Sequence, residues 1–302
     1  TFDYGYNTDI VEGFRKEYDT TVDPGTLKAG TEMFDNWCRF RENIINSWVE
    51  EVYELVISTK PDLWISSACY PDALTVPKTL YQNFTNWIEN GWMDEIFSMS
   101  YSTDNKVVRD NAELFESLIK DKAFYSTGIS AFGETTKSDF ASQLDIIRGV
   151  GADGSAVFSL GSITADNYQE VMIKSSYSKK SVQTYLLNKT ISAGMNDMLR
   201  KLDTVYGFER DYKFSDKIKP IINDMLKKAD KFDSEKATVR QKLQYTETAI
   251  SDLERIITAI NTVSVSEDEK EMKDALIKDF ERYKEYMTQS QYRLRARLTE
   301  NK

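Results

Sequence analysis

The segment Pro61–Tyr101 constrains the fold of this chain more than any other part of its sequence. Two short apolar runs, Leu63–Cys69 and Ile96–Tyr101, flank an amphipathic helical segment that carries Trp87, Ile88 and Trp92. Aromatic and acidic residues follow each run, as Tyr70-Pro71-Asp72 and Tyr101-Ser102-Thr103-Asp104. This order is typical of a β/α barrel, in which the functional residues follow the C-terminal ends of parallel strands.

The same alternation of apolar runs and helical segments continues on both sides of this segment. The predicted strands are Leu63–Cys69, Glu95–Tyr101, Ala123–Phe132 and Gly154–Leu160. The predicted helices between and before them are Met33–Thr59, Asn105–Lys120 and Ser138–Val150. Because the runs do not alternate polar with apolar residues, the strands are expected to be buried on both faces, as in parallel βαβ units.

Four such units are half of a closed barrel, which has eight. We therefore predict an α/β fold in which residues 1–185 form the second half of a TIM barrel. A smaller, free-standing α/β sheet is the alternative. The chain begins at Thr1 without an initiator methionine or a signal segment, so we interpret it as a fragment whose missing N-terminal half of the barrel lies upstream.

Residues 186–302 are expected to form a separate helical bundle. Strand signals disappear after about Asp203, and three charged segments, Phe214–Phe232, Glu235–Val263 and Glu267–Leu298, carry apolar residues at helical spacing. The segment Asp166–Lys201 is also mostly helical and links the two parts. The bundle is either a solvated domain that folds alone or a spacer or docking element for the cell envelope or a protein partner.

Composition excludes several classes of function. A net charge of −10 argues against nucleic-acid binding, which needs a basic surface. The chain has no histidine, so it contains neither a Ser-His-Asp triad nor a histidine-based zinc site, and we predict no metal and no cofactor. The two cysteines make no disulfide framework. No apolar run approaches the ~20 residues of a transmembrane helix.

Six segments in a fixed order resemble one protein family. They read DYGYN, CRFRENI, KPDLWISSACYPDA, NWIENGWMDEIFSMSY, GISAFGE and GADGSAVFSLGSI. Together they resemble the bacterial glycosyl-hydrolase-like ten family, the family-10-like glycosyl hydrolases, which includes glycosidases that act on denuded peptidoglycan strands. The match covers roughly residues 2–165, the second half of the family's barrel. It implies a polysaccharide substrate and an extracellular or cell-envelope location.

The chain departs from the family's pattern at two of these segments. Where members carry two adjacent arginines, this chain has Arg39-Phe40-Arg41, so only Arg41, Glu42 and Asn43 match in place. A family strand ending in Val-Tyr is here Ser98-Met99-Ser100-Tyr101.

Two carboxyl groups are candidates for catalysis, because glycoside cleavage commonly uses a pair about 5 Å apart for retention or about 6.5–9.5 Å apart for inversion. Asp72 follows the first predicted strand, and Glu134 follows the third. The alternatives are a turn residue for Asp72 and an exposed residue before a helix for Glu134. One member of a true pair can also lie in the missing half.

Six further residues are candidates for substrate binding: Tyr6, Asn7, Arg41, Tyr70, Tyr101 and Asp104. Aromatic rings stack on sugar rings, and polar side chains bind hydroxyl and carboxylate groups. The competing roles are rim packing for the tyrosines, a surface ion pair for Arg41 and a helix N-cap for Asp104. A non-catalytic carbohydrate-binding or scaffold protein on the same fold is the alternative function.

Overall fold

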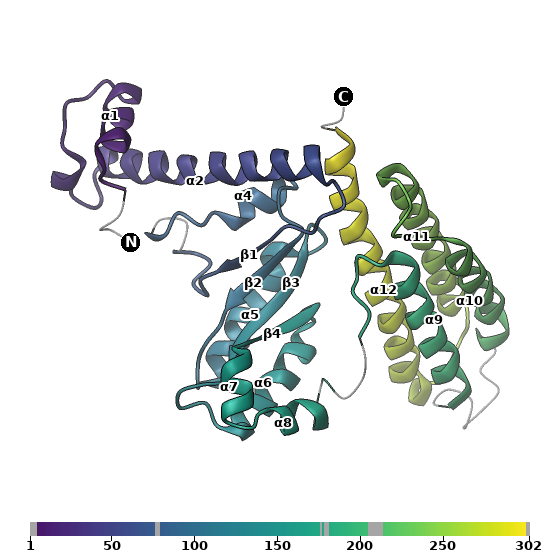
Figure 1. Cartoon of the computed structure of the whole chain (residues 1–302). Coiled ribbons are helices and arrows are strands. Elements are labelled where there is room, and N and C mark those ends of the chain that lie inside the picture. Colours follow the sequence, from purple (N-terminus) through teal and green to yellow (C-terminus); the bar gives the residue numbers. More distant parts are fainter. Residues whose placement is uncertain (1–4, 76–78, 176, 178–180, 205–213, 300–302) are drawn as a thin grey trace. The chain divides into compact units, whose positions relative to one another are not determined.

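A computed structural model of the chain describes residues 5–75, 79–175, 177, 181–204 and 214–299 (Figure 1). The chain divides into two compact units. The first, here called the α/β unit, contains residues 1–120 and 124–178. The second, here called the helical unit, contains residues 179–302 and the short segment 121–123.

The α/β unit contains a four-stranded sheet with the order β1-β2-β3-β4, and every neighbouring pair is parallel. The strands are β1 (Ser66–Cys69), β2 (Glu95–Met99), β3 (Phe124–Ser130) and β4 (Gly154–Phe158). Each lies inside one of the four predicted apolar runs, which confirms an α/β fold with a parallel sheet.

Helices α4 (Phe84–Glu89), α5 (Asn105–Ile119) and α6 (Lys137–Val150) connect successive strands, and α5 and α6 cover one face of the sheet. Helix α2 (Glu32–Thr59) precedes β1 and packs against α4. Helices α5 and α6 pack against β2, β3 and β4, and the ring of Tyr125 in β3 stacks on Phe115 of α5 at a centroid distance of 5.6 Å. On this face Ile96 and Ile129 are fully buried. Residues of β2 that point to the other face, such as Phe97 and Met99, are only half-buried.

Local capping fixes the ends of these helices. Thr136 and Asp139 form a capping box at the start of α6, and Gly151 ends that helix in the left-handed conformation with φ of 97°. Thr31 caps α2, which stops before Pro61 because the residue before a proline disfavours helical backbone. Short helices α7 (Leu160–Ala165) and α8 (Gln169–Lys174) follow β4.

An aromatic cluster joins the first two helices of the unit. Helix α1 (Thr8–Glu17) is followed by a 3-10 turn, η1 (Pro24–Thr26), and then by α2. Phe14 of α1 packs edge-on against Trp37 and Phe40 of α2, with centroid distances of 5.0 and 5.6 Å. Burial of these three rings holds α1 against the N-terminal half of α2.

Acidic residues at the N-terminal ends of the strands have structural roles. Asp94 accepts a hydrogen bond from the backbone N–H of Ile65 at 2.7 Å, and Asp153 accepts one from Tyr125 at 2.9 Å. Glu95 accepts from the Ser126 hydroxyl at 2.7 Å and from the Trp64 indole N–H at 3.0 Å. These contacts tie neighbouring strands together at the end of the sheet opposite to the candidate site.

Replacement of Glu95 by glutamine should flatten the pH dependence of stability. Burial raises the pKa of Glu95 above its ordinary value of 4.5, although hydrogen bonds from Ser126 and Trp64 lower it in part. The folded state therefore binds the proton of the Glu95 carboxyl group more tightly than the unfolded state does. The stability that this protonation contributes is fully present below pH 4.5 and is lost as the pH rises through the pKa of the folded state.

Chemical denaturation of wild type and Glu95→Gln at several pH values measures this effect. The unfolding free energy of the variant minus that of wild type should increase from pH 4.5 upward and then level off. The glutamine amide can still donate to Ser126 and accept from Trp64, so the packing is kept. A difference that is constant with pH would show that Glu95 titrates alike in both states.

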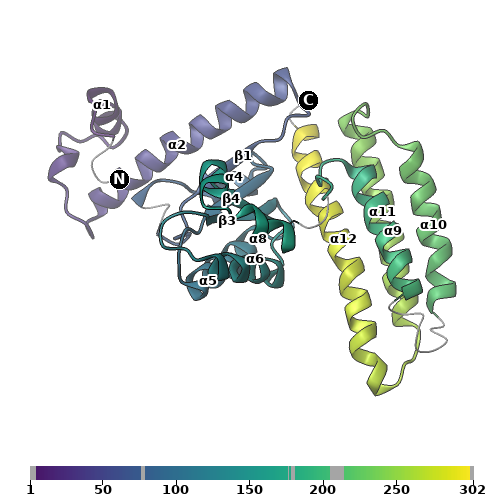
Figure 2. The ribbon, with the colours of Figure 1, turned by 60° about the horizontal axis from the view of Figure 1, so that its bottom comes forward.

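The helical unit is an all-α bundle. Its described helices α9 (Leu187–Thr204), α10 (Phe214–Lys231), α11 (Val239–Asn261) and α12 (Glu267–Thr299) run alongside one another (Figure 2). They share one apolar core in which, for example, Met195, Leu253 and Phe280 are fully buried. The sequence predicts three helices here, whereas the structure places α9, expected as part of a linker, in the same core as a fourth.

No helix within the described ranges is long and apolar enough to cross a membrane.

Candidate functional site

Three exposed aromatic rings meet at the C-terminal ends of neighbouring strands. Tyr101 follows β2, Phe132 follows β3 and Phe158 ends β4. Ring centroids lie 6.0 Å apart for Tyr101 and Phe132, 5.7 Å for Tyr101 and Phe158, and 6.0 Å for Phe132 and Phe158. The residues are 40%, 40% and 56% exposed, respectively. We call this group the three-ring surface.

Backbone contacts hold the three-ring surface in place. The amide of Ala131 donates to the carbonyl of Phe158 at 2.9 Å, which aligns the ends of β3 and β4. The buried Gln143 of α6 donates to the carbonyl of Ser102 at 2.9 Å and so fixes the loop after Tyr101. The Tyr101 ring lies over Gly128 of β3, where a Cβ would stand 3.6 Å from its Cε1 atom. The surface is therefore set by the sheet and by α6.

Tyr101 keeps its phenolic proton over the ordinary pH range, because partial burial raises its pKa above 10.0. Its hydroxyl group can therefore donate a hydrogen bond to a ligand oxygen while its ring face makes apolar contact.

Glu134 stands in a short anchored loop at the end of β3. The preceding Gly133 has φ of 69°, a left-handed conformation that turns the chain out of the strand. The next residue, Thr135, is buried, and its hydroxyl hydrogen-bonds with Ser130 at 2.9 Å. The Tyr168 hydroxyl donates to the Thr135 carbonyl. This loop therefore holds an exposed carboxyl group two residues from Phe132.

Asp72 and Asp104 both take part in local turns. The two carboxylate oxygens of Asp72 accept from Thr75, from its amide at 3.3 Å and from its hydroxyl. Asp104 is the N-cap of α5 and accepts from the Lys106 amide at 2.8 Å. These are the turn and N-cap roles that the sequence offered as alternatives for the two residues.

Arg41 and Tyr6 come together in an aromatic cage. The guanidinium carbon of Arg41 lies 4.4 Å from the ring centroid of Tyr81, 4.6 Å from that of Trp37 and 5.3 Å from that of Tyr6. Arg41 is only 4% exposed, so its charge is directed into the protein. Cation–π contacts of this kind stabilise the packing of α2 against the segments that carry Tyr6 and Tyr81.

Two other predicted binding residues lie at loop and helix boundaries. Asn7 is the residue before α1, and its carbonyl accepts from the amides of Ile10 and Val11, both at 3.1 Å. Tyr70, at the end of β1, is 53% exposed, and its amide donates to the Gln82 side chain at 3.1 Å. The Tyr70 ring is thus available to a ligand at the same end of the sheet as the three-ring surface.

Phe158 was not singled out from the sequence. A signal was nevertheless present, since Phe158 lies near the end of the fourth apolar run, Gly154–Leu160, as Tyr101 and Phe132 lie at the ends of the second and third. Among the described residues, no group of three or more Cys, Asp or Glu side chains could hold a metal ion.

Comparisons with models of protein families, with characterised proteins and with solved structures find no match for this chain.

Proposed function

We propose that this chain is a glycoside hydrolase-like protein whose α/β unit binds a bacterial cell-envelope polysaccharide through the three-ring surface. The observation that carries this proposal is the meeting of Tyr101, Phe132 and Phe158 as exposed rings at the C-terminal ends of parallel strands. That end of the strands is where ligands bind in β/α barrels. The polysaccharide class comes from the resemblance of residues 2–165 to the glycosyl-hydrolase-like ten family.

Aromatic faces suit the apolar C–H face of a pyranose ring. Burying three exposed rings that already contact one another requires little reorganisation of the protein on binding. The Tyr101 hydroxyl adds a donor for a sugar oxygen. This arrangement favours a neutral, ring-shaped ligand over an extended acidic one.

Glu134 is the carboxyl group best placed for proton transfer in such a protein. It is exposed at the rim, beside Phe132, and the anchored loop keeps it there. Asp72, by contrast, uses both oxygens in a turn with Thr75. Glycoside cleavage with Glu134 then needs a partner carboxyl group other than Asp72, about 5 Å away for retention or about 6.5–9.5 Å away for inversion.

Alanine substitution of the three rings tests glycan binding. Tyr101→Ala, Phe132→Ala and Phe158→Ala should each weaken binding to purified peptidoglycan glycan strands by about tenfold or more, because each removes one stacking face. Leu63→Ala is the matched control, since Leu63 is an exposed apolar residue of the same unit away from the site. Binding that is unchanged in all three ring variants would contradict the proposal.

Glu134→Gln separates an enzyme from a binding protein. If Glu134 transfers a proton, the variant keeps its affinity for glycan strands and loses release of reducing ends by at least ~100-fold. The alternative function is non-catalytic carbohydrate binding or scaffolding, with the helical unit mediating assembly. It is favoured by the turn role of Asp72 and predicts binding without turnover in both the wild type and the variant.

A further inference from the structure

Helix α2 carries apolar residues on two opposite faces. Val49, Tyr53 and Ile57 are buried at four-residue spacing on one face. Asn46, on the same side, accepts a hydrogen bond from the indole N–H of Trp87 in α4 at 2.7 Å. The opposite face carries a second stripe, here called the outer stripe, formed by Phe40, Ile44, Trp48 and Leu55.

Helix α1 covers only the first part of the outer stripe. Phe14 packs against Phe40, and Ile44 packs at the edge of the same cluster. Beyond Ile44 the stripe continues uncovered, with Trp48 62% exposed and Leu55 63% exposed. Single exposed apolar residues are ordinary, but these two extend a face that an amphipathic helix already occupies.

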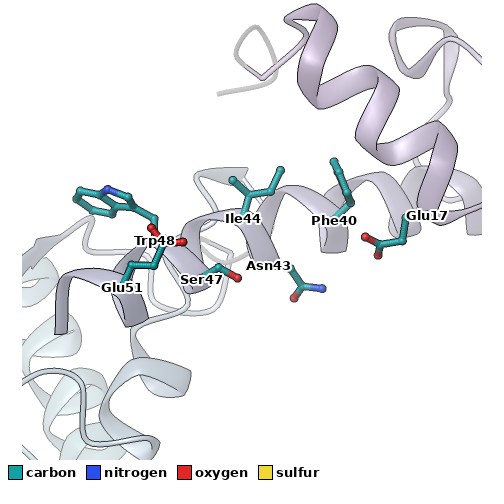
Figure 3. A pocket seen from close by; sticks show the side chains of 7 residues that line it. All are labelled: Glu17, Phe40, Asn43, Ile44, Ser47, Trp48 and Glu51. Carbon is teal, nitrogen blue, oxygen red and sulfur yellow. The ribbon is translucent and has the colours of Figure 1, made fainter. Parts of the chain in front are cut away.

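A groove lies where α1 ends. It has a volume of about 350 Å³ and is lined by Glu17, Phe40, Asn43, Ile44, Ser47, Trp48 and Glu51 (Figure 3). In this view the side chains of Phe40, Ile44 and Trp48 follow one another along α2. The groove therefore combines an apolar side with carboxylates contributed by both helices.

The charge around the groove selects its partner. The charged residues that line the groove are Glu17 of α1 and Glu51 of α2, and none of the lining residues is a lysine or arginine. Two copies of this face would bring like charges together, which disfavours self-association. A basic partner gains both the apolar contact and the favourable electrostatic interaction.

We propose that the outer stripe beyond α1 is a docking site for a basic amphipathic helix of a partner protein. The partner places its apolar face on Trp48 and Leu55, continuing the covering that α1 begins, and its flanking lysines or arginines meet Glu17 and Glu51. This is helix-in-groove recognition. The site is separate from the three-ring surface and does not depend on glycan binding.

Calorimetric titration of the full 302-residue chain tests this site. The probe is a synthetic amphipathic helix with a leucine face flanked by lysines, and the comparison peptide has glutamates in place of the lysines. The lysine peptide should bind, and the glutamate peptide should bind at least ~10-fold more weakly. Trp48→Ser and Glu51→Lys should each weaken binding of the lysine peptide by about tenfold.

Two control variants test whether the weaker binding is specific to the groove. Ile173→Ser removes an equally exposed apolar residue of α8, and Glu50→Lys makes the same charge change on an α2 residue that does not line the groove. Neither should change the affinity for the lysine peptide. Equal binding of both peptides, or unchanged binding by Trp48→Ser, would overturn the proposal. A concentration-dependent dimer in light scattering that Trp48→Ser abolishes would assign the stripe to a second copy and would also overturn it.

Discussion

Replacement of Gly128 by alanine is expected to destabilise the α/β unit by about 3 kcal/mol. Gly128 lies in the middle of β3, a strand that is buried along its whole length. A Cβ atom there would stand 2.6 Å from the backbone carbonyl oxygen of Ser98 in β2. Because the obstacle is the neighbouring strand, the only relief is a shift of the β2–β3 pair, and that shift strains the sheet.

Gly154→Ala is the matched control for this experiment. At Gly154 of β4 a Cβ would stand 2.5 Å from the hydroxyl oxygen of Ser126, which can rotate away. The expected cost is the hydrogen bond from Ser126 to Glu95, about 1 kcal/mol. Urea denaturation followed by far-UV circular dichroism compares the two variants. Equal costs would show that β2 and β3 are not in the register that places Ser98 opposite Thr127.

The Gly128→Ala variant is also expected to disturb the three-ring surface. The Tyr101 ring lies over this glycine, so displacement of β2 from β3 moves Tyr101 away from Phe132 and Phe158. Gly128→Ala should therefore weaken glycan binding under conditions in which the unit is still folded, whereas Gly154→Ala should not. This difference separates loss of the site's geometry from loss of the fold.

The strands and helices were predictable because their signals are local. Each observed strand lies within an apolar run, and α2, α5 and α6 begin and end within one residue of their predicted limits. The end of α2 before Lys60-Pro61 and the end of α6 at Gly151 follow from backbone preferences of single residues. Periodicity and capping contain this information without any tertiary contact.

The candidate site was only partly predictable, because burial depends on residues distant in sequence. Arg41 has the chemistry of a ligand for carboxylates, but Trp37, Tyr6 and Tyr81 enclose it, and two of these come from other segments. Tyr101 and Phe132 were recognised as strand-end residues. Their contact with Phe158 depends on the parallel order of β2, β3 and β4, which no local pattern specifies.

The packing of α9 was only partly predictable, for the same reason. Leu187, Ile191, Met195, Met198 and Leu202 follow helical spacing, which predicts a helix with one apolar face. The segment lies inside the predicted helical domain of residues 186–302, but it also overlaps the predicted linking segment Asp166–Lys201, and only the three later helices were expected to form the bundle. Only the packing shows that this face lies in the core shared by α10, α11 and α12.

Gly194→Ala tests whether α9 packs in this core, because the packing decides whether the substitution raises or lowers the stability of the helical unit. In an isolated helix the substitution stabilises by up to about 1 kcal/mol, because glycine is a poor helix former. At Gly194, however, a Cβ would stand 2.6 Å from Cζ and 2.8 Å from Cδ1 of Tyr283 in α12. Forcing the two helices apart should outweigh the gain and destabilise the helical unit by about 1–3 kcal/mol.

Gly149→Ala in α6 is the matched substitution with open space, since nothing lies within 4 Å of a Cβ there. It should stabilise the α/β unit by about 0.5–1 kcal/mol. Adding Tyr283→Ala to Gly194→Ala should recover part of the lost stability, because the two changes act on one contact and are not additive. Thermal denaturation of these three variants and of Tyr283→Ala alone, each against wild type, measures these signs. If Gly194→Ala stabilised the protein as Gly149→Ala does, α9 would not pack against α12, and the core would be formed by α10, α11 and α12 alone.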